Sequence, residues 1–185
     1  MGSPETEDFI TVDDYMQGEQ LSEVRHEYIG GQVHAMAGGS EAHNTISLNL
    51  ATAIRQHIRG KPCKVFMADM KLRLDIAEDD IFYYPDVLVT YDPADNKKYY
   101  KTQPVVLIEV LSPTTERLDR REKFLSYQRL PSLQEYVLVD QEKMAVTLFR
   151  KSTEWKPVHL LEGDSLGLSS IDFKLSLKAV YEDVL

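Results

Sequence analysis

The amino-acid sequence predicts an α/β (α+β) fold, a mixed β-sheet flanked by helices. Apolar residues recur at three- and four-residue spacing over about residues 41–59, the pattern of an amphipathic helix. Residues 105–111 and 135–140 are almost continuously apolar, which is typical of strands buried on both faces. The segment 113–130 between them has the length of a helical crossover, the connection that parallel strands require. These observations favour a sheet covered by helices on both sides.

The N-terminal half supplies a hairpin, a helix and three strands. Thr11 predicts a capped short helix, and HEYIGGQVHAM predicts two short strands that turn at the paired glycines. Residues 64–75 alternate between apolar and charged side chains, as in one half-buried strand. A second strand is expected at about 83–91, within YPDVLVTY, and the run at 105–111 is the third.

The C-terminal half completes the order helix, three strands, helix, strand. Ser112 is expected to cap the helix 113–130, with Pro113 at its first position. The strand 135–140 follows. AVTLFRK and KPVHLLE predict extra C-terminal strands, and a short helix is expected near 176–183.

Length and composition indicate a single domain. The chain has 185 residues, of which 43% are hydrophobic and 28% charged, as in a globular protein with a sizeable core. We expect one domain over residues 1–185, with residues 1–8 as a flexible tail. The apolar runs are too short to cross a bilayer, and ETEDF lacks the order of a secretory signal. We therefore expect a cytoplasmic protein with no membrane association.

The cysteine count and the charge limit the possible ligands. The single cysteine, Cys63, excludes an internal disulfide framework and a cysteine-rich zinc site, so hard divalent cations are the natural candidates. The formal net charge of −9 argues mildly against a protein whose main task is to grip a polyanion. Basic residues do concentrate between Arg55 and Arg73 and in KKYYK at 97–101, although each patch alone is explained by ordinary solvated charge.

Two carboxylates stand out by their context. Asp86 follows Pro85 directly before an apolar strand, and Glu109 lies inside the apolar run PVVLIEVL, where an ionised group is costly without a partner. Adjacent strands lie about 4.8 Å apart, so both side chains can reach one cation, which suits Mg²⁺ (or Mn²⁺). A turn role for Asp86 and a buried ion pair for Glu109 are the alternatives.

Three polar side chains form one line along the following helix. Asp119, Lys123 and Tyr127 recur at every fourth position. A surface ion pair between Asp119 and Lys123 explains the spacing. Alternatively, Lys123 turns toward the carboxylates, where its ammonium can orient a water or stabilise charge on a phosphate, with Asp119 positioning it.

The motifs HEYIGGQV, YPDVLVTYD, VVLIEVLSPTT, DRREKFLSYQ and EYVLVD occur in this order along most of the chain. In this the sequence resembles the Uma-type restriction-endonuclease-like family within the PD-(D/E)XK nuclease superfamily. The resemblance implies a restriction-endonuclease-like core with metal ligands at Asp86 and Glu109, and the main-chain carbonyl of Val110 as a further oxygen. The superfamily pattern has lysine where this chain has Leu111, and the resemblance implies that the catalytic lysine has moved to Lys123.

Three further residues are secondary candidates. Glu27 matches an acid in the family's N-terminal hairpin and is a candidate to extend the metal shell, with a surface strand acid as the alternative. His43 is a candidate to face the site or a phosphate, although a capping or surface role is the simpler interpretation. Lys71 is a candidate nucleic-acid contact, against an ordinary solvated lysine.

The leading functional hypothesis is an endonuclease that hydrolyses DNA with Mg²⁺ or Mn²⁺, using Asp86, Glu109 and Lys123. The resemblance also implies a homodimer, because restriction-type nucleases pair two sites to cut both strands. A catalytically inactive module that keeps the nuclease fold and binds nucleic acid or protein is the alternative. A carboxylate-pair glycosidase is a remote third reading, because it gains nothing from Lys123.

Overall fold

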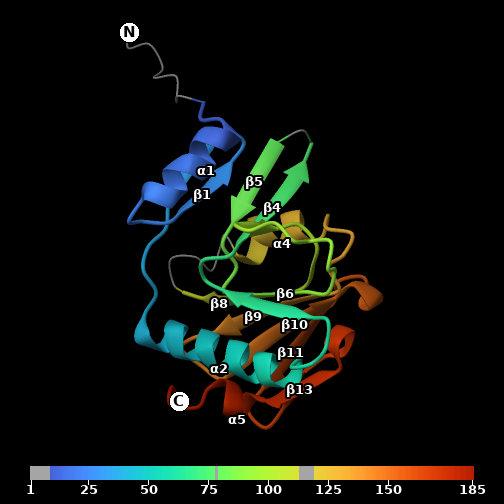
Figure 1. The fold of residues 1–185 in the computed structure, drawn as a ribbon. Helices are drawn as coiled ribbons and strands as arrows, with labels where there is room; N and C mark the ends of the chain where they lie inside the picture. Colours follow the sequence, from blue (N-terminus) through green and yellow to red (C-terminus); the bar gives the residue numbers. More distant parts are fainter. Residues whose placement is uncertain (1–8, 78, 113–118) are drawn as a thin grey trace.

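The computed structural model describes residues 9–77, 79–112 and 119–185, and the part it describes contains two larger β-sheets and one small one (Figure 1). The larger sheet has six strands in the order β11-β10-β9-β8-β6-β3. Its strands are β3 (Lys64–Met67), β6 (Val87–Thr90), β8 (Pro104–Leu111), β9 (Glu135–Asp140), β10 (Ala145–Arg150) and β11 (Pro157–Leu161). Only β8 and β9 run parallel among these neighbours, as a crossover connection requires.

The second sheet has five strands in the order β2-β1-β5-β4-β7. Its strands are β1 (His26–Ile29), β2 (Gln32–Ala35), β4 (Lys71–Ile76), β5 (Asp79–Tyr83) and β7 (Tyr100–Lys101). The β1–β2 hairpin turns at Gly30 and Gly31, whose φ angles of 53° and 95° suit the tight turn and favour glycine. The predicted N-terminal hairpin is therefore confirmed.

Among the described residues, α2 (Glu41–His57) is the longest helix. The others are α1 (Val12–Leu21), α4 (Phe124–Tyr127), α5 (Leu177–Val180), a π-helical turn (Asp119–Lys123) and two 3-10 turns (Lys151–Thr153 and Ser169–Ile171). Thr11 and Ser40 cap α1 and α2, because their hydroxyl oxygens accept hydrogen bonds from the main-chain N–H groups of Asp14 and His43. A small hairpin of β12 (Ser165–Leu168) and β13 (Phe173–Ser176) precedes α5. No helix in the described ranges is long and apolar enough to span a membrane.

The elements form layers with apolar cores between them. Figure 1 shows α1 beside the five-stranded sheet, and α2 lying along the six-stranded sheet. One core joins α2, the six-stranded sheet and the C-terminal hairpin through residues such as Ile54 and Ile108. A second core lies between the two larger sheets and includes Leu107, Leu111 and Tyr127. Neighbouring residues of β8 therefore face different cores, which decides where Glu109 points.

The mixed fold with flanking helices is confirmed, but three predicted elements differ in detail. Residues 64–75 form β3 and β4 in different sheets, because Ala68 adopts φ 45° and breaks the strand. The predicted strand 83–91 is likewise divided between β5 and β6. Within the predicted helix 113–130, residues 113–118 lie outside the described residues, and the helix that follows ends at Tyr127.

The predicted helix–three strands–helix–strand order reappears within the six-stranded sheet. There α2 is followed by β3, β6 and β8, and α4 is followed by β9, while β4, β5 and β7 belong to the second sheet. The extra C-terminal strands β10 and β11 are confirmed, whereas the β12–β13 hairpin was not predicted. Residues 1–8, the predicted tail, lie outside the described residues.

Candidate functional site

The pairing of β6 with β8 brings Asp86 and Glu109 together. Val87 pairs with Ile108 in antiparallel register, so Asp86, one residue before β6, stands opposite Glu109. The main-chain N–H of Val110 donates a hydrogen bond of 2.7 Å to Oδ2 of Asp86. The strand pairing and this hydrogen bond therefore hold Asp86 next to β8 at the position of Glu109.

Glu109 projects toward the core between the sheets. Alternation along β8 places Ile108 and Val110 in the core under α2, and places Glu109 on the opposite side with Leu107 and Leu111. Glu109 is only 2% exposed, and the hydroxyl of Tyr127 donates a hydrogen bond of 2.7 Å to its Oε1. Burial is the main cause that raises the pKa of Tyr127 well above its ordinary value, and the nearby Glu109 carboxylate adds to it.

Lys123 reaches back to the carboxylates from the π-helical turn. Its ammonium nitrogen lies 3.6 Å from Oε1 of Glu109 and 3.0 Å from Oε1 of Glu27. The residue is 4% exposed, and the ammonium also stands 5.4 Å from the centre of the Tyr83 ring. The interpretation of Lys123 as half of a surface ion pair is therefore wrong. The side chain of Asp119 lies outside what the structure describes.

Glu27 is a buried residue of β1, so its interpretation as a surface strand acid is wrong as well. It is 7% exposed, and its Oε1 accepts no hydrogen bond among the described residues although the Lys123 ammonium stands close by. The contact is an ion pair without hydrogen-bond alignment. Glu27 does not line the cavity that contains Asp86 and Glu109. Glu27 therefore contacts Lys123 and is not among the residues that surround the proposed metal ligands in the cavity.

His43 lies in the first turn of α2 and faces Asp86. Its Nε2 is 3.2 Å from Oδ2 of Asp86, so the simpler interpretation as a surface histidine is wrong. Gly39 makes this approach possible, because a Cβ atom at that position would stand 2.9 Å from Nδ1 of His43. The helix cap is also tied to the larger sheet, since the Ser40 hydroxyl donates a hydrogen bond of 2.7 Å to Oε1 of Gln141 just after β9.

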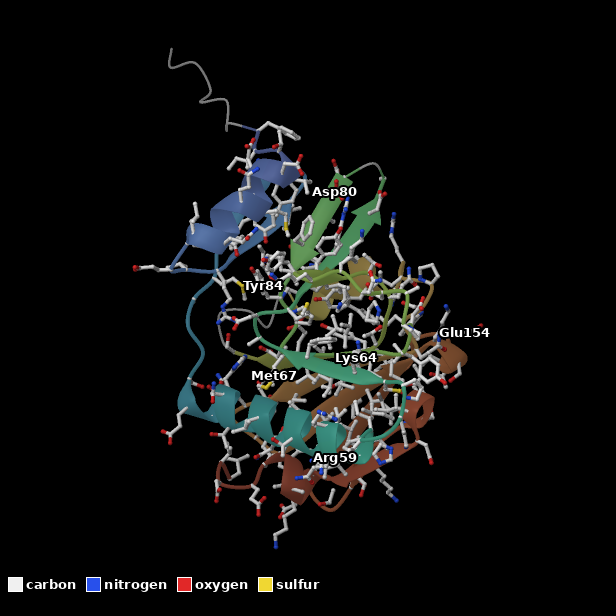
Figure 2. All side chains as sticks on the ribbon, viewed as in Figure 1. Arg59, Lys64, Met67, Asp80, Tyr84 and Glu154 are labelled. Carbon is white, nitrogen blue, oxygen red and sulfur yellow. The ribbon has the colours of Figure 1, made fainter. Side chains whose placement is uncertain are left out.

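A cavity of about 330 Å³ contains these groups. It is lined by Arg25, Met36, Ala37, Gly38, Gly39, Ser40, His43, Asn44, Ser47, Met67, Ala68, Tyr84, Asp86, Glu109, Val110, Ser112, Lys123 and Gln141. Figure 2 shows Tyr84 on the side of the five-stranded sheet and Met67 on the side of α2. The cavity therefore opens between the two larger sheets at the N-terminal end of α2, which we call the site cavity.

The donor set of the site cavity fits a hard divalent cation. Asp86 and Glu109 supply carboxylate oxygens, and Val110 also lines the cavity. No cluster of three or more metal-ligating side chains is present among residues 9–77, 79–112 and 119–185. Two carboxylates completed by main-chain oxygen and water are typical of Mg²⁺ sites.

Sequence reasoning missed a network beside the site cavity. The side chain of Glu19 of α1 is 3% exposed, and its carboxylate accepts a hydrogen bond of 2.5 Å from the Tyr84 hydroxyl and lies 2.7 Å from Nδ1 of His26. The pKa of Tyr84 is raised, chiefly by burial and then by its hydrogen bond to Glu19. Tyr84 stands two residues before Asp86, and Glu19 belongs to a helix whose polar pattern gave no signal of this contact.

Lys71 is buried beside this network, so the expectation of a solvated lysine is wrong. It is 6% exposed, and its ammonium stands 5.2 Å from the centre of the Tyr84 ring. Burial lowers its pKa from the ordinary value, an effect partly opposed by Glu19 and Asp69. The face of the sheet that carries Lys71 was predicted to be polar, but Tyr15 of α1 packs there against Tyr28 and Phe82 in an apolar cluster.

Two hollows of about 450 and 410 Å³ lie elsewhere in the molecule. The first has Asp75 and the second has Glu135 as its acidic residue. Glu135 is engaged by the main-chain N–H and hydroxyl groups of Ser169 and Ser170. Neither hollow brings two carboxylates together, so the smaller site cavity is the better candidate for chemistry.

The chain has a mixed sheet with Glu109 on β8, Asp86 directly before the neighbouring β6 and Lys123 on the helical turn that follows, and this arrangement is that of the restriction-endonuclease-like nuclease fold. Comparison with known proteins agrees. The model of the Uma2 family, described as "Putative restriction endonuclease", matches residues 12–178. The chain therefore belongs to the Uma2 family.

Relatives and a solved structure extend this comparison. One uncharacterized protein of the cyanobacterium Synechocystis is 35% identical over 175 residues, covering 93% of this chain and 91% of its own. Another from Synechocystis is 34% identical over 149 residues, covering 79% and 83%. A crystal structure described as a putative nuclease of DUF820 from Anabaena variabilis has a TM-score of 0.75 at 18% identity, covering 95% of this chain and 99% of that chain. Its fold is that of the present protein.

Proposed function

We propose that the protein is a metal-dependent endonuclease that hydrolyses phosphodiester bonds of DNA. Membership of the Uma2 family supports a nuclease. The proposal of metal-dependent DNA cleavage is based on one observation: Asp86, Glu109 and Lys123 line the same cavity. The main-chain N–H of Val110 donates a hydrogen bond to Asp86, and the Lys123 ammonium lies 3.6 Å from Glu109. These groups come from three different elements, and together they match the needs of phosphodiester hydrolysis.

The carboxylates of Asp86 and Glu109 and the carbonyl of Val110 would hold Mg²⁺ or Mn²⁺. When bound, such an ion polarises a phosphoryl oxygen and lowers the pKa of a coordinated water. Asp86 is oriented for this role by the Val110 N–H and His43 at its Oδ2. Glu109 is oriented by the Tyr127 hydroxyl. Both carboxylates are thus fixed before a ligand arrives, which lowers the cost of ordering the site.

Lys123 supplies a positive charge where the phosphate would develop negative charge. Its ammonium can donate a hydrogen bond to the attacking water or to a phosphoryl oxygen. Glu27 positions this ammonium through the ion pair at 3.0 Å, and this is the role we assign to Glu27 in place of metal binding. Leu111, at the usual lysine position, is 5% exposed and packs in the core between the sheets.

A cleavage assay tests the proposal. Wild-type protein is incubated with plasmid and oligonucleotide DNA in Mg²⁺ or Mn²⁺, beside Asp86→Asn, Glu109→Gln and Lys123→Met. We expect cleavage by the wild type and its loss in all three variants. Lys143→Met, which removes an exposed lysine on the β9–β10 turn, is the matched control and retains activity. Equal cleavage by wild type and Asp86→Asn would remove that residue from the mechanism.

A binding module that keeps the nuclease fold is the second candidate. Leu111 at the usual lysine position and the net charge of −9 favour it. Such a module binds nucleic acid or protein but shows no metal-dependent cleavage under any condition that keeps the chain folded. A homodimer remains a prediction for either function, and sedimentation analysis of the purified protein tests it.

A further inference from the structure

Lys71 is a buried lysine that has no role in the proposed hydrolysis. The residue is 6% exposed, and no described carboxylate lies within ion-pair distance of its ammonium, whose close neighbour is the face of Tyr84. Burying an ammonium without an ion pair costs free energy, and burial accordingly lowers its pKa. A methionine at this position would fill similar space without that cost.

Lys71 belongs to a row of cations and tyrosines that leads away from the site cavity. Arg25 and Tyr84 line the cavity, and the Arg25 guanidinium stands 5.9 Å from the centre of the Tyr84 ring. The Lys71 ammonium stands 5.2 Å from the same ring. The row therefore begins at the wall of the site and passes to the first residue of β4.

The row continues onto the segment before β7. Lys71 pairs in parallel register with Tyr100, so Lys98 and Tyr99 pass next to the start of β4. The Lys98 ammonium lies 4.9 Å from the centre of the Tyr99 ring, and that tyrosine is 40% exposed. We call Arg25, Lys71, Lys98, Tyr84 and Tyr99 the tyrosine–cation strip.

Two acidic residues, Glu19 and Asp69, lie beside the strip, and both favour the charged form of Lys71. Glu19 is occupied by the Tyr84 hydroxyl and His26. Asp69 pairs with Arg25 at 3.4 Å, but the two side chains are 91% and 42% exposed. An exposed pair of this kind contributes little, so Arg25 can exchange Asp69 for another anion. In a chain of net charge −9 the strip is a local positive exception beside the proposed metal site.

We propose that the tyrosine–cation strip binds the sugar–phosphate backbone of the nucleic acid that flanks the scissile phosphate, with Lys71 and Arg25 each contacting a phosphate. A phosphate at Lys71 supplies the ion-pair partner that its ammonium lacks among the described residues, and the ammonium nitrogen is not one of the fully buried atoms that have no hydrogen-bond partner. Tyrosine faces interleaved with cations are typical of surfaces that follow a nucleic-acid strand. The inference rests on the proposed nuclease function and assigns that function a substrate-binding surface.

Fluorescence anisotropy with a short labelled DNA duplex, measured in EDTA over a series of salt concentrations, tests this surface. Lys71→Met is compared with the wild type and with Lys174→Met, a matched control that removes an exposed lysine of β13. We expect Lys71→Met to bind more weakly and to lower the magnitude of the salt slope by about one, as loss of one phosphate contact predicts. We expect Arg25→Gln to lower the affinity and the magnitude of the salt slope in the same way, and Lys174→Met to change neither.

The outcomes separate this inference from the proposed function. If the wild type binds and cuts DNA while Lys71→Met and Arg25→Gln keep the wild-type salt slope, the strip is overturned and the nuclease proposal stands. If the wild type cuts DNA in Mg²⁺ but binds none in EDTA at any salt concentration, the strip is overturned and the nuclease proposal stands; if it neither binds nor cuts DNA, both are overturned. Circular dichroism confirms that each variant is folded, and if Lys71→Met does not fold, Arg25→Gln decides the question by the same slope.

Discussion

Glu109 lies inside an apolar strand because its partners lie on a different element. Its carboxylate is 2% exposed and would be strongly destabilising alone. The Tyr127 hydroxyl at 2.7 Å and the Lys123 ammonium at 3.6 Å offset that cost. The buried charged groups of the site therefore stabilise one another: Lys123 contacts both Glu109 and Glu27.

Replacing Tyr127 with phenylalanine tests its contact with Glu109. The change removes one hydrogen bond to a buried carboxylate, so we expect the free energy of unfolding to fall by about 1–3 kcal/mol. Urea denaturation measures it. Tyr99→Phe, which removes the hydroxyl of a partly exposed tyrosine, is the control and changes stability little. A Tyr127→Phe variant as stable as the wild type would show that Glu109 does not need this donor.

Lys71 predicts a dependence of stability on pH. Because burial lowers its pKa in the folded chain, the unfolded chain holds this proton more tightly. Between the lowered pKa and its ordinary value of 10.5, the unfolded state binds more protons, so this lysine's destabilising effect declines as pH rises. We therefore expect Lys71→Met to be at least as stable as the wild type at neutral pH.

That advantage should shrink as the pH approaches 10.5, in urea titrations repeated at several pH values. The other ionisable groups are the same in both proteins, so the difference between their free energies of unfolding reports chiefly on the lysine. Lys174→Met, an exposed control, should show no such trend. A Lys71→Met variant that is less stable at neutral pH and gains on the wild type as pH rises would contradict the account.

At the scale of elements, two junctions place the chemical groups. The β6–β8 register sets Asp86 opposite Glu109, and the first turn of α2 sets His43 against Asp86. The Ser40 cap fixes where α2 begins, and Gly39 leaves room for the imidazole. The start of this helix is therefore part of the site as well as part of the fold.

Replacing Gly39 with alanine tests this junction. The new Cβ atom would stand 2.9 Å from Nδ1 of His43, so the ring must move relative to Asp86. We expect Mn²⁺ affinity, measured by calorimetry, to fall about tenfold, as for other losses of a group that orients a ligand. Gly38→Ala is the matched control, because its added Cβ meets no atom within 4 Å. Equal affinities for the two variants would contradict a role for His43 in orienting Asp86.

At the scale of the whole molecule, apolar periodicity predicted the sheet and its parallel crossover but not the second sheet. The strands β8 and β9 and the helix α2 have long, unambiguous patterns, and all three are confirmed. The alternation over 64–75 misled because Ala68 carries no local signal for its left-handed φ angle. The division into two sheets depends on tertiary pairing, which periodicity does not encode.

The candidate site was predictable in part for the same reason. Asp86, Glu109 and Lys123 stood out because each was a charge in an unusual context or matched a family motif, and the fold brings them together. The burial of Glu27 and Lys71 and the approach of His43 were not predictable. They follow from packing between segments that are distant in sequence.

The proposed nuclease activity depends on Asp86 and Glu109 forming one divalent-cation site. Isothermal titration of Mn²⁺ into the wild type, Asp86→Asn and Glu109→Gln tests it most directly, because it needs neither a substrate nor turnover. We expect one saturable site in the wild type that each substitution abolishes or weakens severely, while circular dichroism shows that the variants remain folded. Equal Mn²⁺ binding by all three proteins, or no binding by the folded wild type, would contradict it.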